Sequence, residues 1–438
     1  MLKIIPAQDT AAWKERLARR AQARHPEEEH LVRRILEAVE HEGDEALFSY
    51  TRKFDDFDIT TENIRVSEQE IEQAYSEVPK EVRQLLVEAA ANIEAFHRHQ
   101  KRENWFIERP DGSFLGQLYI PVATAAVYVP GGTAAYPSSV LMNIVPAKCA
   151  GVETVCVGTP ARGGSINPVT VVAAHVAGAD AIYKIGGAQA VAAFAFGTAS
   201  VPKADVIAGP GNIYVALAKR LLYGRVGIDM IAGPSEICIL ADGKAAAGLA
   251  AADLLSQAEH DVLAASVLVT DSADLARAVD KEVEQQLSTL PRRDIARSSL
   301  ESFGTVIVCD DLDEGVRVVN AIAPEHLEVL TADPEKLLFD IRNAGSIFLG
   351  PYSPEPLGDY FAGTNHVLPT NGTARFASPL NVDNFQKKSS VIYFTREAMA
   401  QEAAKIALFA RTEGLEAHAR SAELRSAASS EPQPESCD

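Results

Sequence analysis

Short apolar runs rich in β-branched residues recur through the middle of the chain, and each is followed by a glycine-containing turn and an alanine-rich segment. This succession of strand, turn and helix predicts parallel sheets covered by helices on both faces. There are more runs than one compact sheet needs, so we expect an α/β protein with two Rossmann-like domains. The predicted strands span residues 125–129, 154–158, 181–185, 205–208, 236–240, 266–270 and 304–308.

The pattern differs at both ends of the chain. Before residue 105, apolar residues such as Leu31, Ile35 and Val39 recur at helical spacing. We therefore predict that residues 1–105 form a mostly helical region that packs on the first α/β domain. After residue 379 the alternation weakens, and only one strand and one helix of an appended tail are expected.

These changes of pattern give the expected domain limits. The chain would cross between the two sheets near the turns V-P-G-G (129–132) and G-P (233–234). The predicted parts are a helical region (1–105), a first α/β domain (106–127 and 235–379), a second α/β domain (128–234), a tail (380–426) and a closing stretch (427–438). The closing stretch is mostly Ser, Glu and Pro without an apolar face, which predicts disorder.

The composition narrows the class of partner. The chain has 438 residues, of which 47% are hydrophobic and 23% charged, as in ordinary globular proteins, and its net charge is -19. Nucleic acids and anionic membranes bind clustered Lys and Arg, so neither is an expected partner. A small-molecule substrate is more consistent with this charge.

The cysteines and the distribution of apolar residues indicate a cytoplasmic protein. The five cysteines are odd in number and lack C-x-x-C spacing, which argues against a disulfide framework. Cys156, Cys238 and Cys309 lie in strand-like apolar runs, where a cysteine is usually a small buried hydrophobic residue. The N-terminus lacks a signal-peptide core, and no stretch of about 18 apolar residues could span a membrane.

The stretch A-I-A-P-E-H-L-E-V-L at 321–330 places an acid next to a base. Glu325 and His326 follow the helix-stopping Pro324 and precede an apolar run typical of a strand. Catalytic groups are often found on loops between rigid elements, although most Glu-His neighbours are solvated surface residues. The pair gains weight from other segments that offer metal-type ligands.

Gln257 and His260 end an alanine- and leucine-rich helix that begins near residue 245. Because they are three apart they share one helix face, the geometry with which a helix presents two metal ligands. A polar helix end capped by His260 is the structural alternative. Asp359 and the less favoured His366 lie in a glycine-bracketed loop without helical period, where Asp359 is either an oxygen ligand or a turn former.

Glu413 and His418 are a weaker pair in the tail. They are five residues apart, about 140° around a helix, so they would not share a helix face. Both could serve one site only if Glu413 precedes the helix or if the segment docks side-on into a cleft.

Three glycine-rich turns could face a nucleotide: Y-V-P-G-G (128–132), G-G-A-Q-A (186–190) and G-P-G-N (209–212). None is a G-x-G-x-x-G sequence. The last two precede predicted helices, whose free backbone N–H groups favour a pyrophosphate. A purely structural role is an equal alternative for each turn.

Together these segments resemble the histidinol dehydrogenase family over roughly residues 5–425. The motifs that carry the resemblance are G-P-S-E (233–236), L-L-S-Q-A-E-H (254–260), A-P-E-H-L-E (323–328), L-G-D-Y (357–360) and E-G-L-x-A-H (413–418). They occur in the family's order and spacing, and such a set is far more specific than any single motif. The polar closing stretch departs from the family's pattern and touches no motif.

The resemblance implies an NAD-dependent, zinc-dependent enzyme that oxidises L-histidinol to L-histidine through histidinaldehyde, the last step of histidine biosynthesis. It implies Glu325 and His326 as the catalytic acid/base pair. The implied ligands of one zinc ion per subunit are Gln257, His260, Asp359 and His418. The implied substrate contacts are Ser235, Gln257, His260, His326, Asp359, Glu413 and His418. The implied NAD contacts are Tyr128, Gln189 and Asn212.

The resemblance also implies a homodimer whose tail crosses to the partner subunit, so that Glu413 and His418 enter the partner's site. The metal would hold the imidazole and amine of histidinol. His326 would take the alcohol proton as hydride leaves for NAD, and Glu325 would activate the water that hydrates the aldehyde.

Three alternative functions are weighed against this one. A paralogous zinc/NAD dehydrogenase could act on another amino alcohol or a sulfonated diol, but the presence of Glu413 and His418 argues against it. A non-catalytic metal- or nucleotide-binding regulator would not need Glu325 and His326. A thiol-dependent aldehyde dehydrogenase would need a well-placed loop cysteine, which the sequence lacks.

Overall fold

A computed structural model describes residues 1–22, 25–131 and 136–427 of the chain. The chain divides into two compact units: Met1–Lys101 with Val122–Phe385 form unit 1, and Arg102–Pro121 with Gln386–Asp438 form unit 2. Gly132 of the predicted V-P-G-G turn, Cys437 and residues 428–438 of the closing stretch lie outside the described residues.

The first sheet of unit 1 is parallel, with the strand order β1-β11-β10-β9-β12-β13. Its strands are β1 (Lys3–Pro6), β9 (Glu236–Ala241), β10 (Ala265–Thr270), β11 (Thr305–Val308), β12 (His326–Leu330) and β13 (Ser346–Leu349). From β9 to β13 this is the Rossmann order, in which the chain returns from the third strand to pair beside the first.

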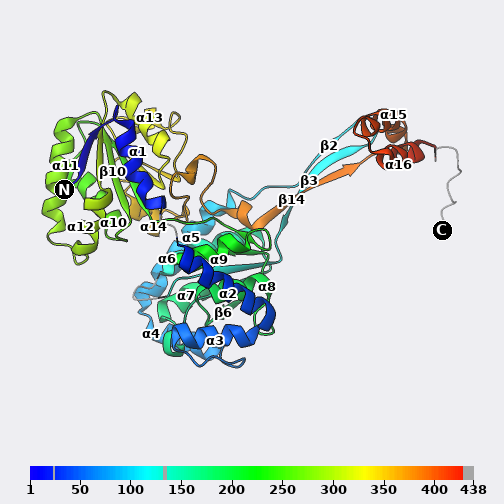
Figure 1. Ribbon diagram of the computed structural model, residues 1–438, viewed down its shortest axis with the longest axis horizontal. Coiled ribbons are helices and arrows are strands. Elements are labelled where there is room, and N and C mark those ends of the chain that lie inside the picture. Colours follow the sequence, from blue (N-terminus) through cyan, green and yellow to red (C-terminus); the bar gives the residue numbers. More distant parts are fainter. Residues whose placement is uncertain (23–24, 132–135, 428–438) are drawn as a thin grey trace. The chain divides into compact units, whose positions relative to one another are not determined.

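Helices cover both faces of the first sheet, as Figure 1 shows. One face packs on α10 (Ala247–Ala258), α11 (Ala273–Leu287) and α12 (Arg293–Phe303). The other packs on α1 (Thr10–Ala18) and α13 (Leu312–Ile322). Coverage on both sides explains why the central strands are continuous apolar runs rather than alternating ones.

The second sheet of unit 1 is also parallel and repeats the Rossmann order, as β6-β5-β4-β7-β8. Its strands are β4 (Thr124–Tyr128), β5 (Thr154–Gly158), β6 (Ala181–Tyr183), β7 (Val206–Ala208) and β8 (Gly227–Ile228). The helices α6 (Pro137–Ala150) and α7 (Pro168–Val176) cover one face, and α8 (Gly187–Phe196) and α9 (Ile213–Leu222) cover the other.

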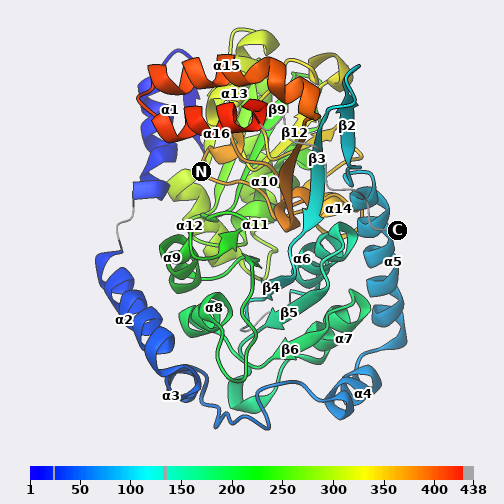
Figure 2. The ribbon, with the colours of Figure 1, turned by 90° about the vertical axis from the view of Figure 1, so that its right-hand side faces the viewer.

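The helices before residue 101 add an outer layer on each side of the second sheet (Figure 2). α2 (Pro26–Glu42) and α3 (Asp44–Asp55) pack outside α8 and α9, whereas α4 (Glu68–Glu77) and α5 (Lys80–Arg98) pack outside α6 and α7. The predicted packing of this region on the first α/β domain is therefore wrong. In its described part, β1 pairs into the first sheet, α1 packs on that sheet, and the short η1 (Arg19–Gln22) bonds β9 through Arg20. The alanine-rich α8 is also apolar on the side that faces away from the sheet, so it can bury the apolar face of α2.

Unit 2 is an antiparallel sheet with the order β14-β3-β2, followed by two helices. Its elements are β2 (Trp105–Glu108), β3 (Phe114–Pro121), β14 (Gln386–Tyr393), α15 (Arg396–Thr412) and α16 (Glu416–Ala427). The pairing runs from Gln386 opposite Pro121 to Tyr393 opposite Phe114. In Figure 1, α15 and α16 lie side by side within this unit.

The fold class is confirmed, but some domain limits differ from those predicted. Residues 106–127 are divided between unit 2 and β4 of the second sheet, and none belongs to the first sheet. Residues 380–385 belong to unit 1 rather than to the tail. Both errors have one cause: β3 pairs with a strand more than 250 residues away, and local patterns carry no signal for such a pairing.

Candidate active site

Glu325 and His326 stand where α13 ends and β12 begins. Ala323 closes α13 in the left-handed conformation (φ 54°), and Pro324 stops the helix from continuing. His326 is the first residue of β12. The two residues are buried, with exposed fractions of 6% and 4%, so they are not the solvated surface pair of the structural alternative.

The first peptide groups of β9 hold both side chains. The backbone N–H of Glu236 donates to Oε2 of Glu325 (2.8 Å), and the carbonyl oxygen of Glu236 lies 3.0 Å from Nδ1 of His326. The parallel register, which pairs His326 with Ile237, brings these groups together. An Nδ1–H that donates to this carbonyl leaves Nε2 of His326 as a lone-pair acceptor.

Side chains of the types that bind metals lie near both ring nitrogens of His326. Asp359 Oδ1 and Glu355 Oε1 each lie 3.9 Å from Nε2, and Gln257 contacts the other ring nitrogen at 3.1 Å. His260, Glu355 and Asp359 offer ligand atoms that all lie within 4.8 Å of one another. The structure thus brings together three of the four predicted metal ligands.

The donor atoms fit a zinc ion. Oε1 of Gln257 and Nε2 of His326 are buried without a hydrogen-bond partner among the described residues. Leaving such atoms unpaired is costly, so a cation or a polar ligand would stabilise the site. Imidazole nitrogens combined with carboxylate and amide oxygens suit zinc.

Asp359 lies on a short helix, α14 (Glu355–Tyr360), and the prediction of a loop without helical period is wrong. Gly358 conceals the helix in the sequence because glycine is a poor helix former. The structure explains its presence: a Cβ at Gly358 would lie 2.6 Å from the ring of Phe348 on β13.

His366 lies beside Asp359, as the sequence allowed. Its Nδ1 is 3.0 Å from the carbonyl oxygen of Asp359, and its Nε2 is 3.3 Å from Oγ of Ser139 on α6. Burial lowers the pKa of His366 and of His260, because it disfavours the charged imidazolium. Both imidazoles are therefore kept in the neutral form that binds metals.

Burial also raises the pKa values of two acids in the site. It raises the pKa of Glu325 to about 8, against the opposing effect of His326. Burial and the neighbouring Asp359 raise the pKa of Glu355 to about 8. A bound cation would favour the ionised carboxylates instead.

Glu328 links β12 to α14 by a hydrogen bond. It lies two residues after His326, on the same face of β12, and is fully buried. Its Oε1 accepts a hydrogen bond from the backbone N–H of Glu355 (2.7 Å), the first residue of α14, and Oγ of Ser256 on α10 donates to Oε2 of Glu355 (3.1 Å). Burial, followed by the charge of Asp253, raises the pKa of Glu328 to about 9.

Sequence reasoning missed Glu328 and Glu355, although a signal was available. Glu328 is two residues from His326 on a strand, and Glu355 is four residues from Asp359 on a helix. Both spacings place a second residue on the same face as the first. The missed helix concealed the second of these relations.

The proposed NAD contacts gather at the carboxyl edge of the second sheet. Tyr128 ends β4, Gln189 lies in the first turn of α8, and Asn212 caps α9. β4 and β7 are neighbours at the point where the strand order reverses, which is where such sheets bind ligands. Their role in NAD binding stays a prediction.

Two of these side chains also have structural roles. The hydroxyl of Tyr128 accepts a hydrogen bond from the backbone N–H of Gly187 (3.1 Å), and burial raises the pKa of this tyrosine to about 12. Oδ1 of Asn212 accepts from two backbone N–H groups of α9. Tyr128 and Asn212 therefore stabilise their turns, and this structural role is compatible with a role in binding.

The remaining predicted contacts lie at the start of β9 and in unit 2. Ser235 directly precedes β9. Glu413 ends α15 and His418 lies on α16, both exposed, with Gly414 (φ 77°) breaking the helix between them. Glu413 thus precedes the helix of His418, one of the two arrangements that the sequence left open.

The cysteines in strand-like runs are buried, as predicted. Cys156, Cys238 and Cys309 have exposed fractions of 4% or less. Burial raises the pKa of the Cys156 thiol to about 11 and that of Cys309 to about 12. Thiols so hard to ionise are poor nucleophiles, which argues against the thiol-dependent alternative.

The doubly wound sheets and the buried glutamate–histidine pair define the class of the protein, an α/β protein with a buried polar site of the kind that enzymes use. The sequence model of the histidinol dehydrogenase family matches residues 18–426, nearly the whole chain. The chain therefore belongs to the histidinol dehydrogenase family, which confirms the resemblance found in the sequence motifs.

Relatives with that name are similar along almost their full length. The chain is 55% identical to histidinol dehydrogenase of Halalkalibacterium halodurans, covering 91% of this chain and 94% of the relative. It is 54% identical to histidinol dehydrogenase of Bacillus subtilis, covering 93% and 96%. The crystal structure of histidinol dehydrogenase from Elizabethkingia anophelis matches with a TM-score of 0.93 at 38% identity, covering 98% and 99%. In the part of the chain described here, no helix has the length and apolar character needed to cross a membrane.

Replacing Glu328 by leucine should loosen the start of α14, because the N–H of Glu355 would lose its buried acceptor. We expect the free energy of local opening at that amide to fall by about 1–3 kcal/mol. Glu328→Gln keeps an acceptor oxygen and should differ little from the unaltered protein. Hydrogen exchange at the Glu355 amide measures both, with Val329→Ala on the opposite face of β12 as control. Equal acceleration in the leucine and glutamine variants would contradict the proposed tie.

Proposed function

We propose that the protein catalyses the NAD-dependent, zinc-dependent oxidation of L-histidinol to L-histidine through histidinaldehyde, the last step of histidine biosynthesis. One histidinol, two NAD⁺ and one water would give one histidine, two NADH and three protons. The observation that carries the proposal is the convergence of Gln257, His260 and Asp359 with the unpaired Nε2 of His326. The names of the full-length relatives support the choice of substrate.

The proposed metal site uses four side chains. Gln257, His260 and Asp359 of one subunit and His418 of the other would hold the zinc ion. When bound, zinc would fix the imidazole and amine nitrogens of the substrate, so its main contribution is positioning. The buried unpaired oxygen of Gln257 supports its role as a ligand.

His326 is proposed as the general base of both oxidation steps. Its Nδ1–H is held by the carbonyl oxygen of Glu236, so Nε2 can accept the hydroxyl proton while hydride leaves for NAD. Glu325 would then take a proton from the water that adds to the aldehyde carbon. The resulting hydrate gives up a second hydride to NAD, and the carboxylate is released.

The proposed NAD site comprises Tyr128, Gln189 and Asn212. The N-termini of α8 and α9 at this edge of the second sheet supply backbone N–H groups suited to a pyrophosphate. Gly209 allows the close approach of β7 to β4 there, since a Cβ at this position would lie 2.1 Å from the carbonyl oxygen of Tyr128.

We further propose a homodimer in which unit 2 donates Glu413 and His418 to the partner's site. Many large apolar side chains of unit 2 are exposed, which marks an interaction surface. They are Trp105, Phe106, Ile107, Leu115, Ile392, Tyr393, Ile406, Leu408, Phe409, Leu415 and Leu424. Among the residues whose burial is described, the apolar cluster between α15 and α16 consists of Ala407, Ala410 and Ala419.

Zinc-loaded protein given limiting L-histidinol and excess NAD should form two NADH per histidinol. Removal of zinc by a chelator should abolish turnover, and added zinc should restore it. Absorbance of NADH measures the yield, and chromatography identifies the product. No NADH from histidinol would refute the proposal, whereas turnover of other amino alcohols or a sulfonated diol alone would favour the paralogue.

The two catalytic side chains should separate the half-reactions. Glu325→Gln should slow oxidation of histidinaldehyde far more than that of histidinol, because only the aldehyde needs an activated water. His326→Asn should slow both by about 10²–10⁴-fold, the usual contribution of a general base. Steady-state kinetics with each substrate tests this, with the exposed Glu335→Gln as control. Equal losses in both half-reactions for Glu325→Gln would contradict its role.

Mixed dimers test whether sites are shared. An inactive His326→Asn subunit and an inactive His418→Ala subunit should together form one intact site per mixed dimer if tails cross. Random exchange would then restore about a quarter of the activity, because half of the dimers are mixed and one of their two sites is intact. Native mass spectrometry can verify exchange. Full exchange without recovery would rule out a crossed tail.

A further inference from the structure

A buried arginine, Arg20, binds residues 234–236, the last of which bonds the proposed catalytic pair. It lies on η1, with an exposed fraction of 4%. Its Nη1 donates to Oε2 of Glu236 (2.7 Å), and Nη2 donates to the carbonyl oxygens of Pro234 (2.6 Å) and Ser235 (3.0 Å). Nε donates to the carbonyl oxygen of Leu263 (2.8 Å). One guanidinium thus binds three consecutive residues, 234–236.

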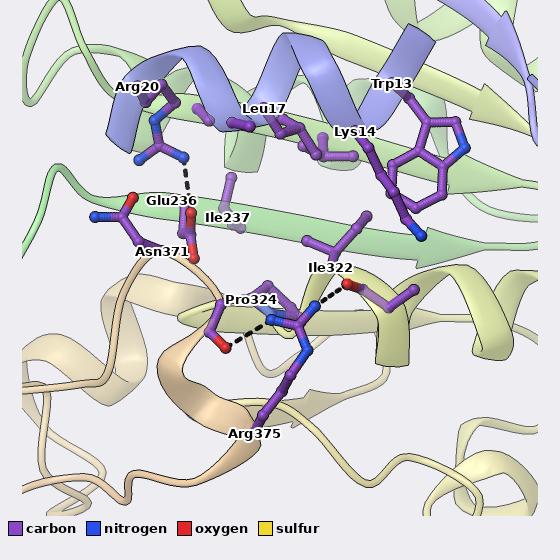
Figure 3. Close-up of a pocket in the computed structure, with 15 residues that line it drawn as sticks. Trp13, Lys14, Leu17, Arg20, Glu236, Ile237, Ile322, Pro324, Asn371 and Arg375 are labelled. Carbon is purple, nitrogen blue, oxygen red and sulfur yellow. Dashed lines mark hydrogen bonds and ion pairs between the residues drawn. The ribbon is translucent and has the colours of Figure 1, made fainter. Parts of the chain in front are cut away.

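Glu236, the last of these three residues, also bonds the proposed catalytic pair. Glu236 has its side chain on the α1 face of the sheet, where Figure 3 shows its ion pair with Arg20, while its backbone N–H and C=O bind Glu325 and His326. A shift of Glu236 would therefore move both catalytic groups. Without Arg20, the carboxylate of Glu236 would be buried without a cation, which is strongly unfavourable.

Contacts other than those of Arg20 also dock the N-terminal segment. β1 pairs with β11, and the N-terminal amino group and the N–H of Leu2 both bind Asp280 (3.0 and 2.7 Å). Arg16 on α1 binds the carbonyl oxygens of Glu301 and Gly304. These contacts do not involve Arg20, whose four bonds are made to residues 234–236 and 263.

We propose that Arg20 is a positioning residue for the oxidation proposed above, on which this inference rests. It acts through Glu236 to keep Glu325 and His326 at the distances from substrate that proton transfer needs. Misplacement of such groups lowers turnover more than substrate binding.

The cavity beside Arg20 offers a way to test this. It has a volume of about 510 Å³ and is lined by Arg20, Glu236 and Ile237 and, across from them, Pro324 and Arg375 (Figure 3). If Arg20 is shortened, a small guanidinium compound can reach the vacated place from this cavity. The test is therefore to assay Arg20→Ala with and without methylguanidinium, at concentrations too low to unfold the protein.

For Arg20→Ala we expect kcat on histidinol to fall by about 10–100-fold while KM changes by about threefold or less. Methylguanidinium should restore kcat several-fold, whereas urea and tetramethylammonium, which lack the charge or the donors, should not. The exposed neighbour Arg19→Ala should keep full activity. An unchanged kcat for Arg20→Ala, or a loss that methylguanidinium does not reverse, would overturn the inference.

Two further variants separate positioning from stability. Val269→Ala, in the core of the same sheet, should lower the melting temperature without lowering kcat; an equal kcat loss there would overturn the inference. Arg20→Lys keeps the charge beside Glu236 but loses the fork to the two carbonyl oxygens, so it should fold and show a reduced kcat. Wild-type kcat in this variant would count against the inference even if Arg20→Ala fails to fold. Inactive unaltered protein would instead refute the proposed function.

Discussion

The hydrogen bonds made by the peptide groups of Glu236 are the constraint on which the site depends. The N–H holds the carboxylate of Glu325, and the carbonyl oxygen lies within hydrogen-bond distance of Nδ1 and orients the ring of His326. These groups are held in place because β9 is a central strand that pairs with β10 on one side and with β12 on the other. The side chains proposed as acid and base are thus oriented by the fold itself.

The residues proposed for the two parts of the reaction lie at opposite edges of similar sheets. The proposed catalytic pair lies at the amino edge of the first sheet, whereas the proposed NAD contacts lie at the carboxyl edge of the second. Contacts from α6, which follows β4, bridge these regions: Ser139 meets His366, and the carbonyl of Met142 accepts from Asn365. Two sheets with the same strand order can therefore contribute to one site when the amino edge of one faces the carboxyl edge of the other.

The sequence was most informative where function depends on local structure. The apolar runs showed the central strands, and Pro324 marked the helix-to-strand junction of Glu325 and His326, because these signals lie within a few residues. The role of Asp359 could be suspected but not its helix, since Gly358 is there for the ring of Phe348, a contact between segments. Arg20 and Glu236 are more than 200 residues apart, and nothing near either residue indicates that they meet.

The division into units explains why the C-terminal part was hardest to interpret. The buried contact between the two helices consists of a few alanines, so the large apolar residues of these helices stay exposed. An exposed apolar surface of this kind marks an interaction site. The spacing of Glu413 and His418 had no explanation within one helix, and Gly414 ends that helix between them. Unit 1 by itself brings together Gln257, His260 and Asp359. In the homodimer proposed above, the contact that covers the apolar surface of unit 2 would also supply the fourth proposed ligand, His418.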